Sequence, residues 1–171
     1  RIHRKYYTTS GSTHFSHLNA DHMATFLWFL SNSIESTICA ERVGYLNRIM
    51  HGIDLFPSVS MPDIFLLVHP LGTVVGRGNF ANYLVLYQGV TVGAVENNYP
   101  TLGEGTILYA GSSVIGDVQS GDNVMFGARS FILGGKIPDN SVVTGQFPNH
   151  EIRPARRKVI EDIFHSTYRA E

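Results

Sequence analysis

A six-residue spacing of apolar residues constrains the fold of this chain more than any other feature of its sequence. Neither an α-helix, with a period of 3.6 residues, nor a flat strand, with a period of two, produces such a spacing. Three short strands of about six residues each complete one turn of a triangular coil, and hexapeptide repeats indicate a β-helix. We therefore predict a mainly β chain with a parallel β-helix over residues 53–150. The positions that carry the spacing are Leu55, Met61, Leu67, Thr73, Val75, Phe80, Leu86, Val92, Leu102, Leu108, Val114, Ser120, Phe126 and Ile132.

The spacing of six is interrupted in places and has one weak position. An offset of two residues separates Thr73 from Val75, and a step of ten residues separates Val92 from Leu102. Ser120 occupies an inward position, so its coil is expected to be less well filled. Small or β-branched residues recur where narrow corners are expected, at Val90, Thr106, Ser112, Val118, Val124 and Ser130. Glycines mark turns that often need a positive φ, at Gly103, Gly105, Gly111, Gly116, Gly121 and Gly127. A β-sandwich, with irregularly spaced turns, does not explain this pattern.

Residues 1–52 are predicted to form an arm and two helices. Residues 1–19 are polar and irregular, so we predict a mobile or partner-dependent arm. A cluster of metal-ligating histidines is the alternative, but no pair of histidines in or near this segment has the i, i+4 spacing of helical metal ligands. Asp21 is the predicted N-cap of the first helix, and the apolar face of that helix is expected to comprise Met23, Phe26, Leu27 and Leu30. The second helix is predicted from Ile34 to Met50, with Gly52 beyond its end. Its buried stripe is expected to comprise Cys39, Val43, Leu46 and Met50.

Two further expectations concern helix ends. His51, in the last turn of the second helix, is interpreted as a cation near a helix C-terminus rather than as a catalyst. Residues 151–171 are predicted to form a C-terminal helix from Pro154 to about Tyr168. We expect this helix to cap the last coil and to hide its unpaired strand edges.

Composition narrows the classes of partner. Only 16% of the 171 residues are charged, against about 25% in typical soluble proteins, which suggests that other subunits cover part of the surface. A net charge of −1 gives no reason to expect nucleic acid or an anionic membrane as partner. No apolar run approaches the roughly 20 residues that span a bilayer, and the single cysteine, Cys39, fits a reducing compartment. The cytoplasm is the expected location.

His69 is the candidate catalytic residue, because residues 55–148 contain no other histidine. A zinc site needs about three such ligands, so no metal is predicted. A single imidazole can instead take a proton from a hydroxyl that attacks an acyl carbonyl, with a carboxylate on its other nitrogen. Asp54, 15 residues earlier, is the predicted partner, and Asp63 is the alternative. A corner residue bonded to backbone is the non-catalytic interpretation of His69.

The run IDLFPSVSMPDIFLLVHPLG, from Ile53 to Gly72, resembles the catalytic region of bacterial serine acetyltransferases. The resemblance continues through TVVGRGNFANYLVLYQGVTVGA, TLGEGTILYAGSSVIG and GDNVMFGARSFIL, to about Gly145. It implies a left-handed β-helix, a homotrimer and acetyl-CoA as cosubstrate. His69 falls on the catalytic histidine of the family, and Asp54 falls on its paired aspartate. The galactoside and xenobiotic acetyltransferases are less similar, because their catalytic histidine lies in the loop between coils, here residues 93–101, which contains none.

Departures from that family concern the acceptor. The family has an aspartate immediately before the histidine, where this chain has Val68, and Arg-His-Pro in the loop, where this chain has Asn98, Tyr99 and Pro100. A zwitterion such as serine needs paired charges in a closed site. A sugar or other neutral hydroxyl compound therefore suits Val68, Asn98 and Tyr99 better. Serine with an altered pocket and a non-catalytic β-helix scaffold remain the alternatives.

The donor site is predicted from small and basic residues. Small residues suit backbone contacts with the arm of coenzyme A, and a backbone amide near Gly93 or Ala94 is expected to hold the oxyanion. The CoA phosphates need cations, which the basic cluster of residues 153–158 offers, although that cluster also fits a solvated first helical turn. The predicted CoA contacts are Gly93, Ala94, Ala110, Gly111, Gly127, Ala128, Arg153 and Arg157.

Overall fold

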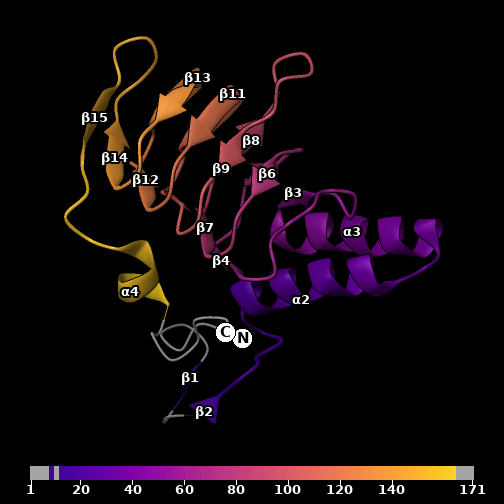
Figure 1. Cartoon of the computed structure of the whole chain (residues 1–171). Helices are drawn as coiled ribbons and strands as arrows, with labels where there is room; N and C mark the ends of the chain where they lie inside the picture. Colours follow the sequence, from indigo (N-terminus) through magenta and orange to yellow (C-terminus); the bar gives the residue numbers. More distant parts are fainter. Residues whose placement is uncertain (1–7, 10–11, 165–171) are drawn as a thin grey trace.

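The computed structural model describes residues 8–9 and 12–164, so residues 1–7, 10–11 and 165–171, with part of the predicted arm, lie outside the described residues. Coils of short parallel strands stack along one axis, and two helices pack beside the first coil (Figure 1). The prediction of a parallel β-helix is thus confirmed. A short antiparallel pair, β1 (Thr8–Thr9) and β2 (Ser12–Thr13), precedes the helices. None of the helices described is long and apolar enough to cross a membrane.

Each coil contributes strands to three faces of the stack. One six-stranded sheet forms the first face, in the order β15-β14-β12-β10-β7-β4, and a seven-stranded sheet forms the other two. The first sheet comprises β4 (Phe65–Val68), β7 (Leu84–Tyr87), β10 (Ile107–Leu108), β12 (Val124–Phe126), β14 (Ser141–Thr144) and β15 (Glu151–Pro154). The second comprises β3 (Asp54–Leu55), β5 (Val74–Val75), β6 (Asn79–Phe80), β8 (Thr91–Gly93), β9 (Thr101–Leu102), β11 (Ser113–Ser120) and β13 (Phe131–Ile137).

Strand register accounts for the period of six. Leu108 pairs with Phe126, and Val114 pairs with Ile132, in each case 18 residues later, which is one full coil. The inward residues of successive coils therefore meet as layers, and most of the predicted positions are buried in one cluster. The step of ten residues between Val92 and Leu102 corresponds to a loop that leaves the coil between β8 and β9.

Two predictions about single positions in the coil are refined. The inward Ser120 is buried, and its hydroxyl accepts a hydrogen bond from the backbone N–H of Gly103 at 3.2 Å, so the polar atom is satisfied. Gly111 has the expected positive φ of 69°. Gly103, by contrast, is absent from the residues with positive φ, and a Cβ there would overlap the carbonyl oxygen of Gly121. Close approach of adjacent coils, rather than φ, requires glycine at this position.

Helix α2 (Ala20–Ser33) begins two residues earlier than the predicted N-cap at Asp21 implies. Its N-cap is Asn19, whose side chain accepts hydrogen bonds from the backbone N–H groups of Asp21 and His22. Asp21 is therefore not the cap, and its carboxylate is available for another contact. The buried face is also rotated from the prediction, because Trp28 is buried whereas Phe26 is 46% exposed.

Helix α3 (Thr37–His51) buries small and polar residues rather than the predicted apolar stripe. Ala40 and Asn47 are its buried residues, and the amide nitrogen of Asn47 donates to the Ala24 carbonyl oxygen of α2 at 2.9 Å. Cys39 is exposed, which corrects its assignment to the core, and Leu46 and Met50 are also largely exposed. Close packing between the helices favours small side chains, which a search for apolar periodicity overlooks.

His51 differs from its predicted role as a cation. Burial lowers the pKa of its imidazole, and this effect outweighs the opposing effect of its contact with Asn47. The ring Nδ1 lies 2.8 Å from the Asn47 side-chain oxygen. The neutral form is therefore favoured in the folded protein, and the α3 C-terminus is completed by Gly52, whose φ is 63°.

The C-terminal segment covers the coil in a different way from the prediction. Residues Glu151–Pro154 form strand β15, which pairs antiparallel with β14 and so covers the last parallel strand edge. Helix α4 is short (Val159–Ile163) and packs against the outer face of the first sheet, next to Tyr83 and Met125. Pro154 ends this edge strand, a place where a residue without a backbone N–H is tolerated.

Candidate active site

His69 stands on a bulge at one corner of the first coil. Three residues, His69, Pro70 and Leu71, separate Val68 from Gly72, whereas in the next coil only Gln88 separates Tyr87 from Gly89. Val68 pairs with Tyr87, and Gly72 lies against Gly89, so the first coil holds two extra residues at this corner. His69 adopts a φ of 49°, and its side chain is 76% exposed. The bulge thus turns the imidazole outward, where a substrate can reach it.

Asp21 is the carboxylate beside His69. Its Oδ1 accepts a hydrogen bond from the backbone N–H of His69 at 2.8 Å and lies 3.9 Å from the ring Nδ1. Asp21 belongs to the first turn of α2, whose start packs against the end of β4, and the residue is only 8% exposed. A buried carboxylate needs such a donor, because desolvation without a hydrogen bond is costly.

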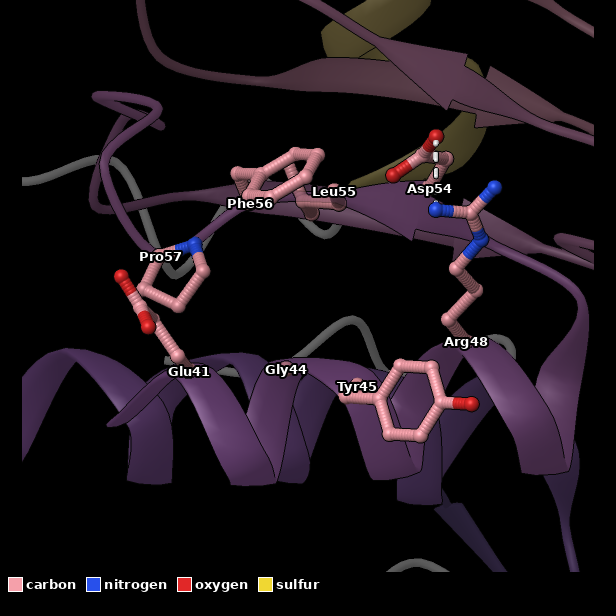
Figure 2. Close-up of a pocket in the computed structure, with 8 residues that line it drawn as sticks. All are labelled: Glu41, Gly44, Tyr45, Arg48, Asp54, Leu55, Phe56 and Pro57. Atoms are coloured by element: carbon pink, nitrogen blue, oxygen red, sulfur yellow. Dashed lines mark ion pairs between the residues drawn. The ribbon is translucent and has the colours of Figure 1, made fainter. Parts of the chain in front are cut away.

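Asp54, the predicted partner of His69, lies beside Arg48 in this structure. Its Oδ2 lies 3.6 Å from an Arg48 guanidinium nitrogen, and no ion pair between Asp54 and His69 occurs in the described part of the chain. Figure 2 shows Asp54 of β3 and Arg48 of α3 paired at one end of a small pocket between these two elements. Arg48 therefore neutralises the carboxylate that was expected to pair with His69. Asp63, the alternative, lies at the opposite end of β4.

The predicted acceptor residues lie apart within one chain. Val68 is 2% exposed and packs in an apolar cluster on the outer face of the first sheet, so it has almost no surface to offer a substrate. Asn98 and Tyr99 lie in the β8–β9 loop, which is closed by paired backbone hydrogen bonds between Val95 and Asn98. Gly93, at the start of this loop, is four residues beyond Gly89, roughly 13 Å along the strand. Gly93 and Ala94 therefore do not lie beside His69 of the same chain.

Four predicted CoA contacts do come together. Ala110 and Gly111 form the corner of one coil, and Gly127 and Ala128 form the same corner of the next coil. The backbone N–H of Arg129 donates to the Ala110 carbonyl oxygen at 2.9 Å, which fixes this stacking. The corner lies in line with Gly89 and Gly72, and hence with the bulge that carries His69. Small side chains leave the backbone of this ledge accessible.

The predicted basic residues lie elsewhere. Arg153 is paired with Glu151 on β15, and the Arg157 Nε lies 4.0 Å from Asp162. The backbone oxygen of Arg157 accepts a hydrogen bond from Asn123, and Asn123 precedes β12 whereas Gly127 follows it. Arg157 is therefore at the opposite end of this strand from the ledge.

Arg129 is the cation that sequence analysis missed. It is exposed, has a φ of 59°, and occupies the corner position held by Gly89 and Gly111 in the two preceding coils. The ion pairs found among residues 12–164 leave its guanidinium without a carboxylate partner. An arginine where the repeat otherwise places glycine is the signal that could have identified it. Among the same residues, no group of three potential metal ligands occurs.

Comparison with known proteins gives relatives among the serine acetyltransferases. No family model matches the chain. A serine acetyltransferase of Synechococcus elongatus is 31% identical over 108 residues, which covers 60% of this chain and 44% of the relative. The chain spans about half the length of the curated relatives it matches, with 59% covered in a serine acetyltransferase of Staphylococcus epidermidis.

Solved structures show the same likeness. A serine acetyltransferase of Brucella abortus superposes with a TM-score of 0.72 at 20% identity, covering 88% of this chain and 64% of that one. A serine acetyltransferase in complex with CoA superposes with a TM-score of 0.66 at 21% identity, covering 76% and 55%. The chain is a hexapeptide-repeat β-helix that is similar to serine acetyltransferases in sequence and has their fold.

Proposed function

We propose that this chain is an acetyl-CoA-dependent O-acetyltransferase with His69 as its general base. The observation that carries the proposal is the exposed imidazole on a corner bulge, in a chain whose relatives are serine acetyltransferases. The ledge formed by Ala110, Gly111, Gly127 and Ala128 lies in line with that corner. An extended thioester cosubstrate lying along the ledge would present its acetyl group near His69.

Direct transfer accounts for the reaction without a covalent enzyme intermediate. His69 takes the proton of the acceptor hydroxyl while the oxygen attacks the thioester carbonyl. The tetrahedral intermediate collapses with cleavage of the C–S bond, and the coenzyme A thiolate receives the proton from the imidazolium. The products are an acetyl ester and free coenzyme A. Cys39 takes no part, because it is exposed on α3, away from this corner.

Serine is the acceptor that the relatives favour, since curated proteins similar to the chain are serine acetyltransferases. The buried Val68 lacks the anion that an ammonium group needs, so serine would bind in an altered pocket. A sugar or other neutral hydroxyl compound is the second candidate, because Asn98 and Tyr99 offer hydrogen-bonding groups without a cation.

A homotrimer would complete the site. In one chain, Gly93, Ala94, Asn98 and Tyr99 lie on the loop side of β8, away from His69. A neighbouring copy can bring this loop to the His69 corner, which would supply the oxyanion amide and the acceptor contacts. The low content of charged residues agrees with such shared surfaces.

A thiol-release assay tests the function directly. Purified protein is incubated with acetyl-CoA and either serine or a panel of sugars, and free coenzyme A is measured. We expect release that depends on serine. Release only with sugars would support the second candidate. A folded oligomer that neither binds CoA nor releases thiol would contradict the proposal and favour a scaffold.

Replacement of Arg129 by glycine tests the donor site. Glycine tolerates the positive φ at this corner, so the variant removes the cation and keeps the turn. We expect the KM for acetyl-CoA to rise about 5- to 10-fold, since a partly screened charge contact with phosphate is worth roughly 1 kcal/mol, while kcat stays within about twofold. Arg153→Gly serves as the matched control, because Arg153 lies on β15. An unchanged KM in the Arg129 variant would show that the phosphates bind elsewhere.

A further inference from the structure

We infer that Asp21, on helix α2, is a positioning residue for His69. The inference rests on the proposed function and assigns a role to a residue outside the coil. Among the described residues, Asp21 provides the carboxylate within 4.0 Å of the His69 ring. The carboxylate of Asp54 faces Arg48 instead (Figure 2).

The contact between Asp21 and the backbone explains how His69 keeps its orientation. His69 has a positive φ, which L-residues with side chains rarely adopt and which persists only where neighbouring groups hold it. The 2.8 Å hydrogen bond from the His69 N–H to the Asp21 Oδ1 supplies such a restraint. Asp21 is itself held, because α2 is capped by Asn19 and the residue is buried.

The position of the charge adds a second effect. The Asp21 Oδ1 lies 3.9 Å from the ring Nδ1, on the side of the imidazole opposite to Nε2. When Nε2 takes the acceptor proton, the ring becomes a cation, and a carboxylate at this distance stabilises it. Nε2 is thereby left as the atom that faces the substrate. The helical segment is therefore part of the catalytic arrangement, and the coil without α2 would lack it.

Two substitutions separate the two effects. Asp21→Ala removes both the hydrogen-bond acceptor and the charge, and we expect kcat to fall about 100-fold. Asp21→Asn keeps an oxygen that can accept from the His69 N–H and removes the charge, and we expect kcat to fall about 10-fold. In both variants the KM for acetyl-CoA should stay within about twofold, because the donor ledge is untouched. Asp117→Asn, at an exposed carboxylate on β11, is the matched control.

The outcomes distinguish this inference from the proposed function. Loss of activity in Asp54→Asn, with full activity in Asp21→Asn, would overturn the inference while leaving His69 as the base. A wild-type kcat in Asp21→Asn, together with a loss of kcat in Asp21→Ala, would show that Asp21 only anchors the backbone of His69. That result would also overturn the inference. Absence of thiol release from the wild-type protein would overturn the proposed function and this inference together. Circular dichroism melting shows whether each variant is folded before its kinetics are compared.

Discussion

Replacement of His69 by alanine is expected to lower kcat for acetyl transfer by about 10²- to 10⁴-fold, the usual contribution of a general base. The side chain is 76% exposed on a corner bulge, so its removal leaves no cavity in the core. The KM for acetyl-CoA should change little, because the ledge of Ala110, Gly111, Gly127 and Ala128 does not include the imidazole. Thiol release under saturating acetyl-CoA measures the effect.

His17→Ala is the control for this experiment. His17 is exposed and lies before α2, outside the candidate site. Its replacement should leave kcat within about twofold. A His69→Ala variant that folds and retains wild-type turnover would exclude His69 as the base and would require the site to be sought at another corner of the coil.

The sequence predicted the coil well because a period of six leaves few alternatives. The predicted inward positions meet in the layers expected, as with Leu108 and Phe126 on the first face. The offset between Thr73 and Val75 also had structural meaning. It corresponds to the two extra residues at the corner of His69. The break in the repeat thus marks the place where the chain presents an imidazole to solvent.

The partner of His69 could not be predicted in the same way. Asp54 lies on β3, which precedes β4 and pairs with β5 of the next coil, so sequence spacing suggested it, whereas Asp21 precedes His69 by 48 residues and belongs to a helix. The contact depends on how α2 packs against β4, which no period within the coil encodes. Arg48, in the last turn of α3, lies beside the Asp54 carboxylate, a contact that spacing within the coil does not predict.

The flanking segments show the limit of apolar patterns. The stripe of Cys39, Leu46 and Met50 suggested a buried face for α3, yet Ala40 and Asn47 are the residues buried there. Small side chains allow helices to approach closely, and a polar Asn47 is tolerated because it bonds to the α2 backbone. At the other end, β15 was mistaken for part of a helix because Pro154 also fits a first helical turn.

Replacement of Phe126 by alanine is expected to lower the free energy of unfolding by about 3–5 kcal/mol, the usual cost of a phenylalanine deletion in a core. Phe126 is fully buried in the layer between Leu108 and Val143, and it is the largest of the fully buried side chains. Neighbouring coils are fixed by their strand ladders, so they cannot collapse into the space. Denaturant unfolding at a fixed protein concentration measures the change.

Two further variants test whether the coil interior is packed in layers. Phe126→Leu places in the layer the same side chain that the preceding coil has at Leu108, so it should cost less than about 1.5 kcal/mol. Phe56→Ala removes a phenyl ring that is 56% exposed and should cost less than about 1 kcal/mol. Equal losses for Phe126→Ala and Phe56→Ala would mean that the layer at Phe126 is not close-packed. The rigid corner that presents His69 depends on the same stacking, because the strands that pair Val68 with Tyr87 belong to the sheet that Phe126 supports.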